Sequence, residues 1–107
     1  MNLTISIKDR LLTSMILPTM FRQTSIVDGL ILKGLKKKLE ITPGEIEELN
    51  IRDGKDGQIL WDSKKEKPVS FELADREVEL LHRGINDPES KVNPELIPAF
   101  FEQLLTI

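Results

Sequence analysis

The chain has 107 residues, of which 39% are hydrophobic and 31% are charged, and its formal net charge is −3 at pH 7. These values are typical of one globular domain that spans residues 1–107. The lack of cysteine excludes disulfides and thiolate metal sites, and apolar runs of at most three residues exclude a transmembrane helix. We therefore expect a cytoplasmic protein that does not bind membranes.

The small net charge conceals an asymmetry along the chain. Residues 1–38 contain seven basic and two acidic residues, which gives +5, whereas residues 39–107 contain eight basic and sixteen acidic residues, which gives −8. Such a split has two interpretations: the two parts attract each other inside one fold, or the basic part is free to meet phosphate or an acidic protein. The sequence leaves both open.

The first predicted elements are a short strand at residues 3–5 and a helix. Ser6, with an acid three residues later, is a capping-box pattern for a helix that begins at Ile7. Pro18 should end this helix at about Leu17, because the proline ring cannot continue the hydrogen-bond ladder. The expected apolar face consists of Ile7, Leu11, Leu12, Met15 and Ile16.

A second helix is predicted to open at Ser25, again with an acid three residues later. Gly34 falls on its apolar side, where a missing side chain would let another helix approach closely. The expected apolar stripe consists of Val27, Leu30, Ile31, Gly34 and Leu35, widened by Leu32 and Leu39. The opposite side should carry a basic group made of Arg22, Lys33, Lys36 and Lys37, whereas Lys38 lies nearer the stripe.

The strongest local signal is the run Thr-Pro-Gly-Glu at residues 42–45. Thr42 is a helix cap, a proline suits the first helical position and Glu45 completes the capping box, so a short helix should span residues 43–49. The apolar pattern then alternates on both sides of a glycine-rich turn, which predicts a hairpin. Together with a third alternating run at residues 69–73, this predicts a three-stranded antiparallel meander.

The C-terminal third is again helical. Asp75 should start a helix that ends near Asn86, and Asn93 should cap a final helix in which Pro98 trims only the first turn. We therefore predict an α+β fold with a helix pair, a short helix, the meander and two C-terminal helices. The order strand, helix, helix, short helix, hairpin is that of a winged-helix domain.

The sequence offers little for catalysis. Its one histidine, His82, is expected at the edge of an apolar helix face, half-buried and hydrogen-bonded locally. Carboxylate pairs such as Glu45/Glu48 are common by chance where acids are this frequent, and no cluster has the spacing of a metal site or a phosphate loop. We therefore expect a protein that is not an enzyme, with no catalytic residues, no cofactor and no metal.

Binding of nucleic acid is one function that the basic residues could serve. A winged-helix domain inserts its third helix into the major groove, but here that helix (residues 43–49) is acidic and would repel phosphates. The basic residues lie on the second helix, where lysines also interact favourably with the helix dipole. The candidate nucleic-acid-binding residues are therefore Arg22, Lys33, Lys36 and Lys37.

Several short motifs resemble those of a known group of proteins. Ile16-Leu17-Pro18 at the end of a capped helix and Gln23-Thr24-Ser25 at the start of the next are similar to small hypothetical proteins encoded by bacteriophages and prophages. Ile59-Leu60-Trp61, and Phe71-Glu72-Leu73 running into Asp75-Arg76-Glu77, extend the likeness over most of the chain. Ala74 stands where such proteins often have Ser or Thr, which leaves Asp75 as the expected cap. The resemblance implies a small phage accessory protein of unknown function, without catalytic residues.

We accordingly expect a non-enzymatic protein–protein interaction module in the host-cell cytoplasm. The alternative is a winged-helix-like protein that binds nucleic acid through the basic face of its second helix. We also expect self-association, since the apolar face of the last helix is larger than the area that the core of one small domain can cover. That face consists of Phe100, Phe101, Leu104 and Ile107.

Overall fold

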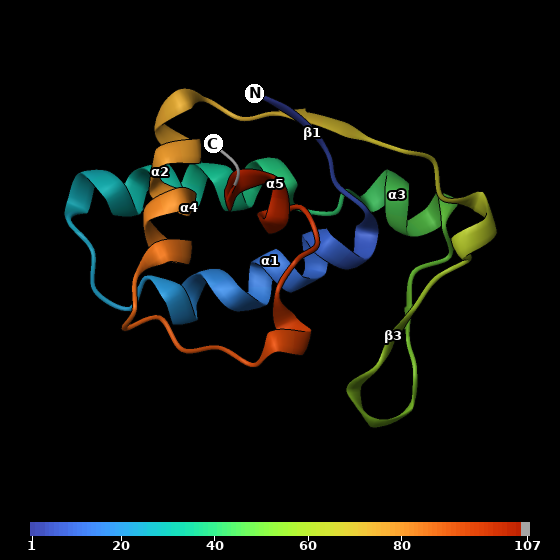
Figure 1. Cartoon of the computed structure of the whole chain (residues 1–107). Coiled ribbons are helices and arrows are strands. Elements are labelled where there is room, and N and C mark those ends of the chain that lie inside the picture. The colour runs from blue at the N-terminus through green and yellow to red at the C-terminus, as the bar shows by residue number, and fades with distance from the viewer. Residues whose placement is uncertain (106–107) are drawn as a thin grey trace.

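Residues 1–105, the part of the chain that the computed structural model describes, contain five α-helices and four short strands (Figure 1). The helices are α1 (Ile7–Met20), α2 (Ile26–Leu39), α3 (Pro43–Glu48), α4 (Asp75–Asn86) and α5 (Phe101–Leu105). The strands are β1 (Asn2–Thr4), β2 (Arg52–Asp53), β3 (Ile59–Leu60) and β4 (Ser70–Glu72). Three 3₁₀ turns are η1 (Lys55–Gly57), η2 (Ser63–Lys65) and η3 (Pro94–Leu96). The predicted α+β class is confirmed.

The helix starts follow the sequence signals. Ser6, Ser25 and Thr42 each accept a hydrogen bond on their side-chain oxygen from the backbone N–H three residues later, at 3.1–3.2 Å. Glu45 in turn accepts the backbone N–H of Thr42 at 3.0 Å, which completes the predicted capping box. At α4 the prediction of Asp75 as cap is wrong: Ala74 holds the cap position, because the carboxylate three residues later accepts its backbone N–H.

The predicted three-stranded meander is wrong, because the strands form two separate two-stranded sheets. β2 and β3 form the predicted hairpin, which projects from the helical body, whereas β4 pairs antiparallel with the N-terminal β1 (Figure 1). Leu3 pairs with Phe71 in that sheet, and the neighbouring Leu73 is buried. Pairing with β1 thus places apolar side chains of β4 on the core. The hairpin offers no such surface, because Ile59 and Leu60 are both 41% exposed.

Two prolines act differently from the predictions. α1 continues past Pro18 to Met20, since a proline this close to the end of a helix removes little of the hydrogen-bond ladder. Pro98, in contrast, separates η3 from α5 and does not merely trim one helix. The reason is that the residue before a proline avoids the helical region, and Ile97 has the extended angles φ −79° and ψ 118°.

The core lies where α1, α2, α4 and α5 meet the β1–β4 sheet. α2 turns Leu32, Leu35 and Leu39 inward and leaves Val27 and Leu30 exposed, so the predicted stripe was rotated from the true one. Apolar residues surround most of α2, and their spacing therefore does not define one face. α1 is rotated likewise: its buried residues are Ile7, Arg10, Thr13, Ile16 and Leu17, and Met15 is 58% exposed.

Close approach between helices occurs at a different glycine from the one predicted. A Cβ added to Gly34 would meet nothing within 4 Å, so no helix packs against it. A Cβ on Gly84, inside α4, would lie 2.5 Å from the ring of Phe21 and 2.8 Å from the side chain of Met20. Gly84 therefore lets the end of α1 approach α4.

One carboxylate ties the hairpin region to the start of α1. Glu66, in the loop after η2, accepts the backbone N–H of Ile7 at 2.9 Å and the indole N–H of Trp61 at 3.1 Å.

The apolar face that we expected to support self-association is not free, because Phe100, Phe101 and Leu104 are at most 3% exposed. Ile107 lies outside the described residues. Between residues 1 and 105, no helix has the length and apolar character needed to cross a membrane.

Candidate functional site

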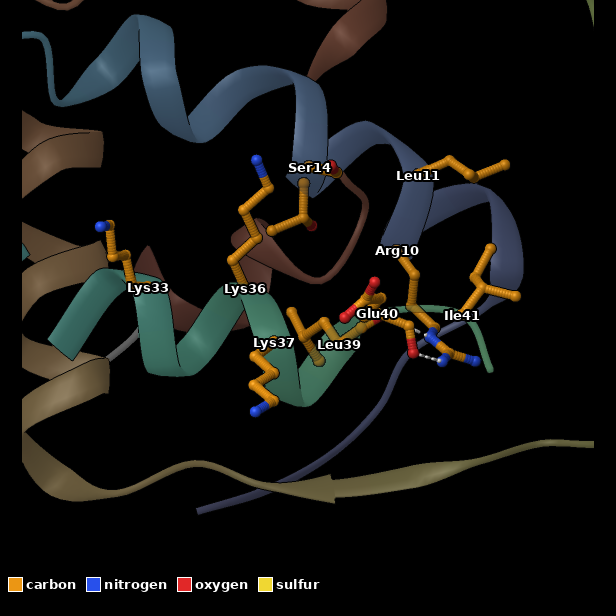
Figure 2. A pocket seen from close by; sticks show the side chains of 10 residues that line it. Arg10, Leu11, Ser14, Lys33, Lys36, Lys37, Leu39, Glu40 and Ile41 are labelled. Atoms are coloured by element: carbon orange, nitrogen blue, oxygen red, sulfur yellow. Dashed lines mark hydrogen bonds between the residues drawn. The ribbon is translucent and has the colours of Figure 1, made fainter. Parts of the chain in front are cut away.

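A groove of about 500 Å³ lies between α1 and the C-terminal half of α2 (Figure 2). Apolar atoms, which include the methylene stems of the lysines, contribute most of its exposed surface, and lysines of α2 border it. The lining residues are Arg10, Leu11, Thr13, Ser14, Lys33, Lys36, Lys37, Leu39, Glu40 and Ile41. Three of the four basic residues singled out from the sequence therefore meet at one feature of the fold.

The three lysines carry the positive charge of the groove. The side chain of Lys36 extends from α2 toward α1, whereas that of Lys37 extends away from α1 (Figure 2). Lys33 lies about one helical turn before both of them. All three are exposed, and among residues 1–105 no carboxylate lies within ion-pair distance of them. Lysines three and four positions apart on a helix repel one another, so this cluster attracts anions.

Two other basic residues near α2, Arg22 and Lys38, do not contribute charge to the groove. Arg22 follows α1 and borders a different hollow, which Asp87 and Glu89 also line. It is therefore not part of the lysine groove. Lys38 donates to the nearly buried carboxylate of Glu77 at 2.6 Å and to the backbone carbonyl of Glu72 at 3.0 Å. The charge of Lys38 is thus used to join α2 to α4.

Arg10 closes one end of the groove and was missed by the sequence analysis. Its side chain is 3% exposed. The guanidinium donates to the carbonyls of Leu39 at 2.9 Å and Glu40 at 2.7 Å, which caps the C-terminal end of α2. It also binds both carboxylate oxygens of Glu45, at 2.5 and 2.9 Å, and lies 5.0 Å from the ring centroid of Phe71.

This buried pair does not add to the basic character of the groove. Hydrogen bonds from Arg10, opposed by partial burial and aided by the bonds from Thr42, lower the pKa of Glu45 from 4.5 to about 2. The carboxylate is therefore ionised at neutral pH and neutralises Arg10. Arg10 lies three residues from both Ile7 and Thr13, on the side of α1 that the structure buries, and this side differs from the apolar face predicted from the sequence.

His82 makes its hydrogen bonds within its own helix, α4. The residue is half-buried, and Asn86 donates its side-chain amide to the His82 carbonyl at 2.9 Å, with the same nitrogen 3.3 Å from Nδ1. The expectation of a half-buried, locally bonded histidine is confirmed. Within the described range, no group of three or more His, Cys, Asp or Glu residues could hold a metal ion.

Comparison of the chain with protein-family models, with curated proteins and with solved structures gives no match.

Proposed function

We propose that the chain is a non-enzymatic protein-interaction module that binds an acidic protein segment at the groove between α1 and α2. The observation that supports this is the combination of apolar lining and unpaired lysines at one place (Figure 2). Carboxylates of a partner would relieve the mutual repulsion of Lys33, Lys36 and Lys37. Apolar side chains of the same partner would gain contact with the groove lining.

The composition of the groove favours protein over nucleic acid. Leu11 and Ile41 supply partly exposed apolar surface, with which a phosphate backbone makes few favourable contacts. Nucleic-acid affinity depends on many Lys and Arg contacts to phosphates, and Arg22 lies apart from the three lysines. Binding of nucleic acid by the basic face of α2 is the alternative that the experiment below distinguishes.

The resemblance of several sequence motifs to small phage-encoded proteins supports a further part of the proposal. We propose that the protein acts as a phage or prophage accessory protein in the cytoplasm of a bacterial host. The acidic partner would then be a host protein. This part of the proposal directs the choice of lysate for the experiment.

The test is affinity capture from a nuclease-treated bacterial lysate. The wild-type chain is compared with a Lys33→Glu/Lys36→Glu/Lys37→Glu variant, and captured proteins are identified by mass spectrometry. The matched control is a Lys64→Glu/Lys67→Glu/Lys91→Glu variant, which makes the same charge change at exposed lysines outside the groove.

We expect a specific acidic protein to be retained by the wild type and the control and lost with the groove variant. Retention by all three proteins would contradict the proposed site. Retention of nucleic acid from an untreated lysate, lost with the groove variant and at high salt, would favour the alternative.

A further inference from the structure

Large apolar side chains cover the exposed side of the first half of α2. Ile26, Val27 and Leu30 are 84%, 63% and 63% exposed, and no other large apolar residue between positions 1 and 105 is exposed as fully. Single exposed apolar residues are ordinary, but three within about one helical turn form a contiguous patch. We call these three residues the apolar half of α2.

The apolar half continues into the lysines of the groove. Ile26, Leu30, Lys33 and Lys37 follow the spacing i, i+4, i+7 and i+11, which places them within a sector of about 60° on one side of the helix. This spacing is the one by which a helix packs lengthwise against another helix. All four side chains are exposed, so α2 presents an unoccupied seam.

We infer that the acidic partner segment is an amphipathic α-helix that lies along this seam of α2. Its apolar side chains contact the apolar half, and its carboxylates meet Lys33 and Lys37. The inference rests on the proposed function and specifies the form of the partner. From Ile26 to Lys37 the seam is about 16 Å long, because a helix rises about 1.5 Å per residue, so the partner helix needs about 12 residues.

The charges of the seam disfavour a second copy of α2 as the occupant. Parallel pairing would place lysines against lysines. Antiparallel pairing would place Lys33 and Lys37 against the start of the other α2, where the helix dipole is positive. The acidic helix α3 has only six residues, about half the length required. A separate acidic helix therefore fits best.

The probe is a fluorescein-labelled, helix-stapled peptide of 14 residues. It carries leucines at positions i and i+4 and glutamates at i+7 and i+11 of one face, with alanine and glutamine elsewhere. A second peptide has the same composition, but its leucines and glutamates are distributed around the helix. The dissociation constants of both are measured by fluorescence anisotropy with the full chain.

We expect the patterned peptide to bind at least about tenfold more tightly than the scrambled one, since each buried apolar side chain contributes about that much. Leu30→Ser and Lys33→Glu/Lys37→Glu should each weaken the patterned peptide at least about tenfold. Two controls, Ile59→Ser/Leu60→Ser and Lys64→Glu/Lys67→Glu, change exposed residues of the same types elsewhere and should leave the affinity within about twofold. All substituted side chains are exposed, so circular dichroism should show an unchanged fold.

The possible failures are distinguishable. Equal binding of both peptides, dependent on Lys33 and Lys37 but not on Leu30, would overturn the helical partner and leave the acidic partner standing. Absence of binding by the patterned peptide would also overturn the inference, and the capture experiment would still decide the proposed function. Sedimentation of the chain with phosphatidylglycerol vesicles tests whether the seam binds an anionic lipid surface instead of a helix. Vesicle binding that Leu30→Ser abolishes would assign the seam to an anionic lipid surface and overturn the inference.

Discussion

Protonation or removal of the Glu45 carboxylate should weaken the junction of α1, α2 and α3. We consider Glu45→Gln, which keeps the shape of the side chain and removes its charge. Glu45 accepts two hydrogen bonds from a guanidinium that is 3% exposed, and it caps the first turn of α3. The variant leaves Arg10 with its two backbone carbonyl partners and with one amide oxygen in place of a carboxylate.

The magnitude follows from the pKa. A decrease from 4.5 to about 2 corresponds to about 3 kcal/mol of folding free energy, and water that reaches the 22% exposed carboxylate screens this to about 2 kcal/mol. Because the pKa is lower in the folded chain, the stabilisation is complete above pH 4.5. It is lost as the pH falls from 4.5 through about 2. The cost of Glu45→Gln should therefore be about 2 kcal/mol at pH 7 and should shrink steadily below pH 4.5.

The assay is urea unfolding followed by circular dichroism at several pH values between 7 and 2.5. The matched control is Glu47→Gln, which makes the same chemical change on the exposed side of the same helix and should cost less than about 0.5 kcal/mol at every pH. A cost of Glu45→Gln that equals the control, or that does not change with pH, would refute the reasoning.

Four other substitutions test the packing and the ion pairs, each by urea unfolding. Arg10→Met should cost about 3–5 kcal/mol, because it leaves a carboxylate and two carbonyls without their cation; a cost below that of a surface substitution would contradict the buried pair. Gly84→Ala should cost about 1 kcal/mol, because the overlap with α1 outweighs the gain in helix propensity, whereas Gly34→Ala should stabilise by about 1 kcal/mol. Equal effects of the two glycine substitutions would contradict the packing. Asp28→Asn should cost about 1 kcal/mol at low salt and less in 1 M NaCl, since Asp28 pairs with two exposed arginines of α4. A cost that does not depend on salt would argue against these pairs.

Features that depend on neighbours in the sequence were predicted well. The caps at Ser6, Ser25 and Thr42 each involve atoms three residues apart, so the sequence alone contains both partners. Whether the basic face of the second helix is free was left open by the sequence, and the structure shows Lys33, Lys36 and Lys37 exposed.

Features that depend on distant partners were not predicted. Arg10 and Glu45 are 35 residues apart, and no local pattern distinguishes a surface arginine from one that meets a carboxylate in another helix. β4 pairs with β1, so that Thr4 lies opposite Ser70. Proximity in the sequence had favoured pairing of β4 with the hairpin, as the third strand of the meander. The orientation of α2 was ambiguous because apolar residues surround it.

The position of Trp61 gives the molecule a built-in optical probe. Trp61 is the one tryptophan of the chain, and its indole shares the Glu66 carboxylate with the first turn of α1. Its emission should therefore change when the hairpin region separates from the body, whereas circular dichroism follows the helices. If the two signals change at different urea concentrations, the chain passes through an intermediate in which the hairpin has detached while the helical core persists. Coincident transitions would mean that the Glu66 junction unfolds together with that core.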